Sequence, residues 1–326
     1  MIKKLYFYES HTVDPYLNLA AERALLDTVD SESLILYLWQ NQSTVVIGRN
    51  QNAFSECRTE LLREEGGTLA RRPSGGGAVF HDLGNLNFTF MCATENYDTS
   101  KHMQVIRRAC LLSGIETEPS GRNDILAAGR KFSGSAFYQT RGRSCHHGTL
   151  LIRADMEKLG RYLTPPKAKM ETKGVSSVRA RVINLSELAP SLTCDEMRAH
   201  ILTAAEAVFG LVPTRAPEPD PETVSHYAER FGDEEYLYGS PIPFNVSCEG
   251  HLPFGHAELR LSVVSGRITE LALYTDALDS ALPAAVREAL VSLPFELSAI
   301  REALSRTIGE AEAAALTSLL SEQIFS

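Results

Sequence analysis

Three consecutive glycines, Gly75–Gly77, constrain the fold of this chain more than any other part of the sequence. They follow two arginines, Arg71 and Arg72, and precede the apolar run 78–80. Glycine tolerates backbone conformations closed to other residues and leaves its N–H groups open to a close-lying ligand. The arginines add forked, charged donors for phosphate or carboxylate. The segment therefore predicts either a tight turn between strands or a loop that holds an anion.

Composition narrows the class of protein. The formal net charge of −9 gives no global attraction for nucleic acid, so a nucleotide would need a local basic site such as residues 71–72. No apolar run is long enough for a signal peptide or a membrane helix. The six cysteines are scattered without a Cys-x-x-Cys pair, so neither a zinc site nor a disulfide framework follows. We expect a cytoplasmic protein that binds no nucleic acid and no membrane.

Strand-like and helix-like patterns alternate along the first 245 residues. Asp14 and Pro15 form a helix start, and the apolar spacing that follows predicts a helix to about Val29. Thr193 and Glu196 form a capping box for a second long helix. Strands are predicted at 34–39, 44–47, 78–80 and 87–92, further helices at 56–64, 103–112 and 155–163, and a strand-and-turn meander at 121–152.

The pattern of prolines, strands and helices changes near the C-terminus, and this change predicts two domains. Prolines crowd residues 213–221, and residues 239–243 add another break. Strands at 258–264 and 268–274 then precede helical segments that run to the end. With 326 residues the chain exceeds the roughly 250 residues beyond which chains tend to split. We expect a larger domain over 1–245 and a small α+β domain over 246–326.

A second polar cluster lies in residues 121–136. Asn123 and Asp124 lie on a predicted turn, where amide and carboxylate groups can contact a purine edge or a ribose. Lys131 lies in a strand-like run, where an unpaired ammonium is costly if buried. An exposed lysine on an edge strand is the commoner arrangement. The alternative is a fixed positive charge that binds a carboxylate and a phosphate together.

Two further segments carry reactive side chains. Cys145, His146 and His147 suggest metal or thiol chemistry, but neighbouring residues of a strand point to opposite faces and cannot all reach one ion. The pattern favours one buried, hydrogen-bonded histidine and one residue in the wall of a site. Residues 173–185 combine three cations, two serines and a glycine in a loop that is either solvated surface or a cover over a nucleotide.

Together these segments resemble the lipoate–protein ligase family, a relative of the biotin protein ligases. The family's Arg-Arg-x-Ser-Gly-Gly-Gly-Ala-Val-Phe-His-Asp stretch is matched at 71–82, its Gly-Arg-Asn-Asp turn at 121–124, its Lys-x-Ser-Gly-Ser-Ala strand at 131–136, its His-His-Gly-Thr-Leu-Leu strand at 146–151, and its Lys-Gly loop at 173–185. The motifs occur in the family's order, and the resemblance covers essentially the whole chain. The link between the second and third motifs is shorter than in some relatives.

The resemblance implies an α+β fold, in which a biotinyl/lipoyl ligase catalytic domain with mixed β-sheets and flanking helices precedes a small accessory domain. It also implies a reaction in two steps. Lipoate and ATP give lipoyl-AMP and pyrophosphate, and a lysine of an acceptor protein then takes the lipoyl group. The implied acceptors are lipoyl domains of 2-oxoacid dehydrogenase complexes, the glycine-cleavage carrier protein, or both. Lipoate and octanoate are not distinguished.

Residue roles follow from this chemistry. A carboxylate that attacks a triphosphate approaches a second anion, so a cation must lie between them, and we expect Lys131 to act in both steps. The expected ATP contacts are Arg72, Gly75, Gly76, Gly77, Ala78, Val79, Phe80, Asn123, Asp124, Lys131, Lys173, Ser177 and Arg181. Asp124 is also expected to contact Mg²⁺. The expected walls of an apolar tail pocket are Trp39, Val79, His81 and His147.

Two other functions stay open. An octanoyl- or lipoyltransferase of the same superfamily acts without ATP through a thioester-forming cysteine. The positions where its branches carry that cysteine hold Pro165-Pro166 and residues 121–124 here, and Cys145 is the cysteine nearest to the site. A lipoyl-binding or scaffold protein without catalysis is the other alternative. An intact Lys131 beside a full glycine motif argues against it.

Overall fold

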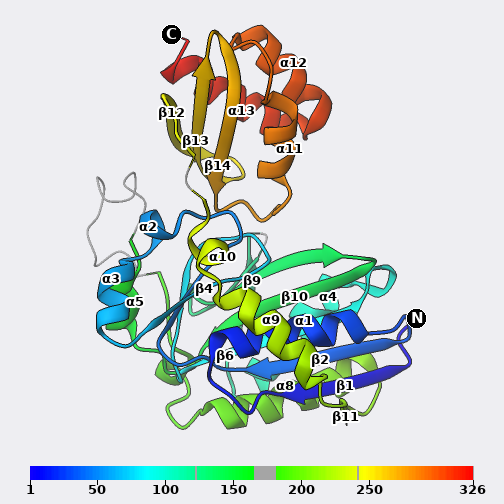
Figure 1. Cartoon of the computed structure of the whole chain (residues 1–326). Coiled ribbons are helices and arrows are strands. Elements are labelled where there is room, and N and C mark those ends of the chain that lie inside the picture. The colour runs from blue at the N-terminus through cyan, green and yellow to red at the C-terminus, as the bar shows by residue number, and fades with distance from the viewer. Residues whose placement is uncertain (122, 165–180, 241, 326) are drawn as a thin grey trace.

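The computed structural model describes residues 1–325 except 122, 165–180 and 241. It shows a larger body that carries the N-terminus and a smaller body that carries the C-terminus, joined by a single connection (Figure 1). The fold is α+β, as predicted.

In the described part of the chain, the larger body is built on a mixed sheet of eight strands. In spatial order these are β11 (Thr214–Arg215), β1 (Lys4–Glu9), β2 (Ser33–Trp39), β6 (Asn85–Ala93), β10 (Arg143–Leu151), β9 (Arg130–Thr140), β8 (Asp124–Ala127) and β7 (Glu118–Ser120). β1 runs parallel to both of its neighbours, and the remaining pairs are antiparallel.

Helices cover both faces of this sheet (Figure 1). α1 (Pro15–Thr28) and α9 (Pro221–Gly232) pack together on one face, and α4 (Thr99–Leu112) and α8 (Cys194–Phe209) pack together on the other. Because side chains alternate along a strand, β2 contributes to both cores. Leu34, Leu36 and Leu38 join the core under α4 and α8, while Ile35, Tyr37 and Trp39 join the core under α1 and α9.

A smaller sheet supports the glycine motif. Its described strands, in spatial order, are β4 (Thr68–Arg71), β3 (Thr44–Ile47) and β5 (Val79–His81). The short helices α2 (Ala53–Glu56), α3 (Thr59–Glu64) and α5 (Met156–Tyr162) pack beside it. The segment from β4 to β5 must cross the end of β3. There a Cβ on Gly48 would overlap the carbonyl oxygen of Gly76, so only glycine allows this crossing.

The smaller body is an α+β unit with its own core. Its described strands are β12 (Val246–Leu252), β13 (Gly255–Val264) and β14 (Arg267–Thr275), all antiparallel. The helices α11 (Leu282–Leu290), α12 (Leu297–Thr307) and α13 (Glu310–Gln323) pack against them, and this core includes no residue of the larger body. The connection follows α10 (Glu234–Tyr238). Two 3-10 helices, Thr94–Asn96 and Leu185–Glu187, complete the described elements.

The glycine motif lies in the junction between the two bodies. The backbone N–H of Gly76 donates to the carbonyl oxygen of Ala277 at 3.1 Å, and Thr275 N–H donates to the carbonyl oxygen of Asn50 at 3.0 Å. A Cβ on Gly75 would overlap the carbonyl oxygens of Ala277 and Leu278. The smaller body (residues 246–325), called the accessory body from here on, therefore rests directly on the motif.

Several predicted elements are confirmed, and the misses have local causes. Asp14 caps α1, as predicted, and the capping box of Thr193 begins α8. The prediction of one helix over 56–64 is wrong. Cys57, which lies between α2 and α3, is extended and forms a β-bridge to Leu163. The prediction of a loop around 213–221 misses β11 and the start of α9, where Asp220 is the N-cap and Pro221 the first helical residue.

The helices in the described residues are all too short or too polar to cross a membrane.

Candidate active site

A cavity of about 130 Å³ lies between the glycine loop, which we define as residues 72–78, and strands β9 and β10. It is lined by Trp39, Arg72, Gly76, Gly77, Ala78, Val79, His81, Asn123, Lys131 and His147, all predicted as site residues, together with Leu19, Val46, Asn87, Gly134, Ser135, Ala136, Gly148 and Thr149. Five segments of the chain, from Leu19 to Thr149, thus meet at one place. One part of the wall is apolar, and Lys131 and Asn123 contribute polar groups.

The other predicted residues lie elsewhere. Gly75 faces the accessory body, and Phe80 is buried under the small sheet with its ring centroid 5.4 Å from that of Tyr162. Asp124 lines an adjoining depression rather than the cavity. Arg181 is exposed, and its carbonyl oxygen accepts from the backbone N–H of Lys131 at 2.8 Å. Lys173 and Ser177 fall outside the described residues.

Arg72 is buried, and its guanidinium holds the glycine loop. Its Nη2 donates to the carbonyl oxygens of Gly75 at 2.8 Å and Gly77 at 2.7 Å, and its Nε donates to Ser74 Oγ at 3.2 Å. Burial lowers the pKa of Arg72 to about 10, while the charge of Glu22 opposes this shift. The side chain is therefore still a cation at neutral pH. It both shapes the loop and places a positive charge in the cavity wall.

Arg71, the other predicted cation, binds the scaffold instead. Its Nη1 donates to the carbonyl oxygens of Gly48, Arg49 and Gln51, and its Nε donates to the carbonyl oxygen of Leu237 at 3.0 Å. These bonds join the segment after β3 to α10. Arg71 does not line the cavity, so of the two arginines Arg72 is the one that faces a ligand there.

Lys131 lies on β9 at the edge of the cavity. Its Nζ is 2.8 Å from Asp124 Oδ1, and its side chain is 40% exposed. Gly134 leaves room for it, because a Cβ there would come within 3.0 Å of the ammonium. The backbone of Lys131 also bridges to Val182, so the chain that begins at residue 181 is fixed beside it. Within the described part of the chain the ammonium is partly exposed and has Asp124 as its ionic partner, so a ligand in the cavity can reach it.

His81 is a neutral part of the cavity wall. Asn18 donates to Asn41 Oδ1 at 2.9 Å, which turns the amide nitrogen of Asn41 toward His81 Nδ1 at 3.2 Å. His81 therefore accepts at Nδ1 and carries its proton on Nε2. Burial lowers its pKa to about 3, and the nearby Arg72 adds to this effect. An uncharged ring suits an apolar substrate tail.

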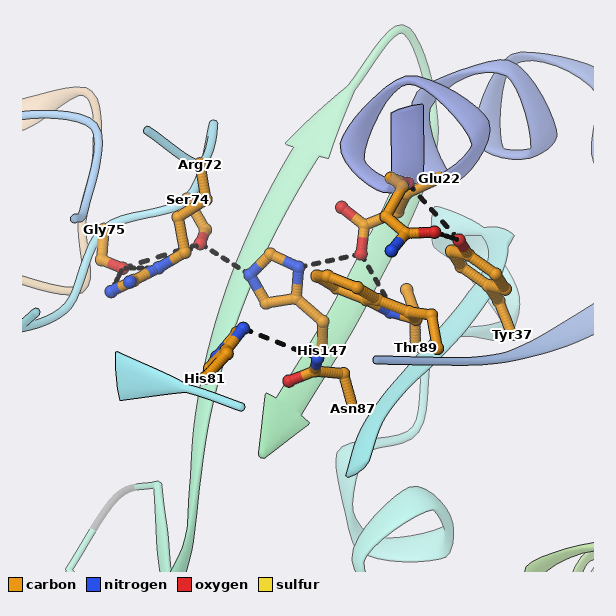
Figure 2. Close-up of polar contacts among 11 residues, drawn as sticks. Glu22, Tyr37, Arg72, Ser74, Gly75, His81, Asn87, Thr89 and His147 are labelled. Carbon is orange, nitrogen blue, oxygen red and sulfur yellow. Dashed lines mark hydrogen bonds and ion pairs between the residues drawn. The ribbon is translucent and has the colours of Figure 1, made fainter. Parts of the chain in front are cut away.

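Glu22 is the main site residue that the sequence pattern does not single out. It is 1% exposed, and its Oε1 accepts from Thr89 Oγ1 at 2.7 Å and lies 2.9 Å from His147 Nδ1 (Figure 2). It occupies the apolar face of α1, three residues after Leu19 and four before Leu26. A carboxylate at an apolar position was the available signal, but its partners become evident only when α1 packs on β6 and β10.

The neighbouring histidine has a different role. His146 points away from His147 to the opposite face of β10, where its Nδ1 lies 3.2 Å from His102 Nδ1. Burial lowers the pKa of His146 well below its usual value. The prediction of one buried histidine and one wall residue describes this arrangement, since His146 is buried and His147 lines the cavity.

Cys145 is close to the site but chemically quiet. Glu22, Cys145 and His147 are the one group in the described residues with ligand atoms close enough to hold a metal, within 4.8 Å of one another. The hydrogen bond between Glu22 and His147 already accounts for that proximity. Burial raises the pKa of the Cys145 thiol well above its usual value. A protonated, buried thiol is a poor nucleophile, which argues against the thioester alternative.

Comparison with known proteins first defines the class. Residues 14–206 match the family described as "Lipoyl protein ligase A/B catalytic domain". The structure of P. falciparum LipL1 in complex with lipoate is similar over 98% of this chain and 100% of that chain, with a TM-score of 0.86 and 28% identity. A lipoate-protein ligase A bound with ATP shares the fold over 73% of this chain and 99% of that chain, with a TM-score of 0.61 and 24% identity. The fold is that of lipoyl protein ligases.

The accessory body then specifies the family. Residues 242–320 match the "Bacterial lipoate protein ligase C-terminus". Lipoate-protein ligase A of Bdellovibrio bacteriovorus is 38% identical over 319 residues, which cover 95% of this chain and 94% of the relative. The chain therefore belongs to the lipoate–protein ligase family and is an enzyme of that family.

Proposed function

We propose that this enzyme uses ATP to convert lipoate into lipoyl-AMP and pyrophosphate, and then transfers the lipoyl group to a lysine of an acceptor domain. The observation that carries the proposal is the position of Lys131. Its ammonium lies at the edge of a cavity whose wall includes the glycine loop and the apolar side chains Trp39 and Val79. A carboxylate extending from an apolar tail and a phosphate held by the loop would meet at that ammonium.

The apolar part of the cavity would hold the lipoyl tail. Trp39 and Val79 offer hydrocarbon surface, and the neutral His81 adds no charge. Two structural relatives, P. falciparum LipL1 and a Thermoplasma acidophilum protein, have lipoate or lipoic acid bound in their structures. This supports lipoate as the substrate, and its tail would lie in the cavity of this chain.

The glycine loop would hold the phosphates. Gly77 and Ala78 line the cavity with little or no side chain, so backbone N–H groups can approach an anion closely. Arg72 would act by fixing the loop and by its charge, since its donors already bind the loop carbonyls. Asn123, at the boundary of the cavity, would contact the adenylate. Gly75 and Phe80 would support the loop rather than touch ATP.

Lys131 would neutralise the carboxylate and the α-phosphate during adenylation and hold the adenylate during transfer. In the first step a carboxylate oxygen attacks the α-phosphorus, and the bond to the leaving pyrophosphate breaks. In the second step the acceptor amine attacks the acyl carbon, and AMP leaves. Asp124 would position the ammonium through the ion pair at 2.8 Å. The loop 173–185 would cover the adenylate against hydrolysis, and the bridge of its described residue Val182 to Lys131 supports this role.

A magnesium ion fits the chemistry of this edge. Asp124 offers carboxylate oxygens, and Mg²⁺ commonly binds through one or two carboxylates together with substrate phosphates. When bound, the ion would neutralise phosphate charge as pyrophosphate leaves. Because Lys131 pairs with the same carboxylate, the ion and the ammonium would share Asp124 or occupy different oxygens.

The acceptor would be a lipoyl domain of a 2-oxoacid dehydrogenase complex or the glycine-cleavage carrier protein. A structure of a bipartite Thermoplasma acidophilum lipoate protein ligase is described with its E2 lipoyl domain. We assign residues 1–245 to catalysis and residues 246–326 to an accessory domain, in line with the separate core of the smaller body.

Pyrophosphate release by the purified full chain tests this function. Release should require ATP, a divalent cation and lipoate together, and omission of any one should remove it. Pyrophosphate release with octanoate in place of lipoate shows which acyl chain the enzyme prefers. If lipoate fails to stimulate release, or if a thioester donor supports lipoyl transfer without ATP, the proposal is wrong.

A further inference from the structure

We propose that Glu22, His147 and Ser74 form a positioning relay that couples the filling of the cavity to the shape of the glycine loop, so that lipoate and ATP bind cooperatively. The proposal rests on the proposed function, because it takes the cavity as the site of the lipoyl tail. The three residues come from α1, β10 and the glycine loop, and Figure 2 shows them in a continuous row with Arg72.

Each pair of neighbours in the row lies within hydrogen-bond distance. Glu22 Oε1 lies 2.9 Å from His147 Nδ1, His147 Nε2 lies 2.7 Å from Ser74 Oγ, and Ser74 Oγ lies 3.2 Å from Arg72 Nε. Glu22 is 1% exposed, Ser74 0%, His147 6% and Arg72 7%. Little water can replace a lost contact there, so each member depends on its neighbours.

The residues at the two ends of the row, Glu22 and Arg72, set the direction of the hydrogen bonds between them. A carboxylate can only accept, so Nδ1 of His147 donates to Glu22, and in the tautomer with its single ring proton there the Nε2 of His147 accepts. Ser74 then donates its hydroxyl proton to His147 and accepts from Arg72. All donors thus point toward the carboxylate, and the positive charge of Arg72 and the negative charge of Glu22 polarise the bonds between them.

The order Ser–His–Glu resembles the arrangement that activates a nucleophile, but the site argues for positioning. Ser74 is fully buried and is not among the residues that line the cavity, so no substrate atom can approach its hydroxyl. Its effect must pass through Arg72, whose Nη2 holds the carbonyl oxygens of Gly75 and Gly77. The relay therefore ends on the backbone of the predicted phosphate-binding loop.

The other end of the relay meets the substrate. His147 lines the cavity, so a bound tail would pack against its ring and exclude water from it. A drier surrounding strengthens the polar row, and the loop is then held more firmly in one shape. Lipoate would then bind more tightly to the protein with an ordered loop than to the protein with a loose loop. Such a difference in affinity is the condition for coupling two sites. ATP would bind best after the tail has filled the cavity.

Calorimetric titration of the full chain measures this coupling. The probe is adenosine 5′-(α,β-methylene)triphosphate with Mg²⁺, titrated with and without saturating lipoate. In the unmodified protein, lipoate should tighten binding of the analogue on the order of 10-fold. Ser74→Ala should bring this factor close to one, because it removes the contact that joins His147 to Arg72. Glu22→Gln, which preserves shape, should reduce the coupling in the same way.

His102→Gln is the matched control. It removes one member of a different buried hydrogen-bonded pair, which lies on the opposite face of the sheet, so the coupling should persist. Coupling unchanged in Ser74→Ala and Glu22→Gln overturns the relay, and so does no coupling in the unmodified protein. If Ser74→Ala fails to fold, Glu22→Gln decides. Pyrophosphate release measured in parallel separates the two claims, because release without coupling overturns the relay alone, whereas no lipoate-dependent release overturns both.

Discussion

The side chains of Arg71, Arg72 and Lys131 differ in how far their donors are already bound to other groups of the protein. Arg71 and Arg72 donate to backbone carbonyls, whereas Lys131 has one ion pair among the described residues and its side chain is 40% exposed. A compact ammonium with one anionic partner can exchange that partner for a substrate anion. Lys131 is therefore the residue at which the proposed chemistry depends on a single side chain.

Lys131→Ala should abolish adenylation and transfer while the fold is retained. Loss of a charge-assisted contact where charge develops should lower both rates on the order of 10² to 10³. Lys131→Arg should fail as well, because a planar fork cannot replace a compact ammonium between two anions. Pyrophosphate release reports the first step, and transfer from synthetic lipoyl-AMP reports the second.

The neighbouring Arg130 offers a matched control for this experiment. It pairs with Glu187 at the surface, so Arg130→Ala removes a positive charge one residue away from the site. Its rates should stay near those of the unmodified protein. Normal rates for Lys131→Ala in both half-reactions would return Lys131 to the status of an ordinary edge-strand lysine.

Buried histidines predict how stability depends on pH. Burial lowers the pKa of His81 and His102 from 6.5 to about 3, and that of His146 well below 6.5. Between the unfolded and folded pKa values, the unfolded chain binds more protons, so stability falls as pH falls below about 6.5. From pH 7 to 5.5 we expect a loss of about 1 kcal/mol per histidine in the free energy of unfolding, measured with urea.

A histidine variant tests whether the buried histidines cause this loss of stability. His102→Gln should flatten the slope by about one histidine's share, because one fewer group takes up a proton on unfolding. Carboxylates contribute chiefly below this range, since their unfolded pKa values lie near 4. An unfolding free energy that is constant from pH 7 to 5.5 would refute this assignment.

At the residue scale, sequence motifs indicated which side chains would gather, but not what each contacts. Glycine and lysine positions in the motifs are read directly from the sequence, and the structure brings Gly76, Gly77 and Lys131 to one cavity. Glu22 could not be assigned in this way. Its partners belong to β6 and β10, and no local pattern encodes which strand a helix packs on.

At the scale of elements, the glycine loop depends on the packing of the strands that carry it. β4 and β5 flank β3, and the loop passes over the end of β3 beside Gly48. Capped helices such as α1 and α8 were predictable because their caps are local. β4 was not, since a short strand is defined by pairing with a segment distant in the sequence.

Gly48→Ala should therefore distort the loop. The added Cβ would overlap the carbonyl oxygen of Gly76, and we expect a loss of about 1–3 kcal/mol in stability together with slower adenylation. Gly77→Ala is the matched comparison for stability, because a Cβ at Gly77 meets no atom within 4 Å. Equal melting temperatures for the two variants would contradict the crossing described here.

At the scale of the whole molecule, the accessory body rests on the loop that we assign to phosphate. Gly76 donates its N–H to Ala277, so that donor is unavailable to an anion in this arrangement. The connection between the bodies lies after α10, near residues 239–245, and not in the proline-rich stretch 213–221, which lies within the larger body beside β1 and α1. Motion of the accessory body would begin at this connection.

We predict that ATP and lipoate together shift the accessory body. A phosphate on the loop competes with the carbonyl oxygen of Ala277 for the N–H of Gly76, which weakens the junction. Small-angle scattering of the full chain should then show a changed profile with both ligands. Gly75→Ala should move the profile in the same direction without ligand, because its Cβ would overlap Ala277. Identical profiles under saturating ligand would count against the motion.

The most direct test of the central claim follows the acyl group to its acceptor. A purified lipoyl domain is incubated with the enzyme, lipoate and Mg²⁺, with and without ATP, and its intact mass is measured. We expect a gain of one lipoyl group on the acceptor lysine that requires ATP and is lost in Lys131→Ala. A gain that appears without ATP, or that persists at the normal rate in Lys131→Ala, would contradict it.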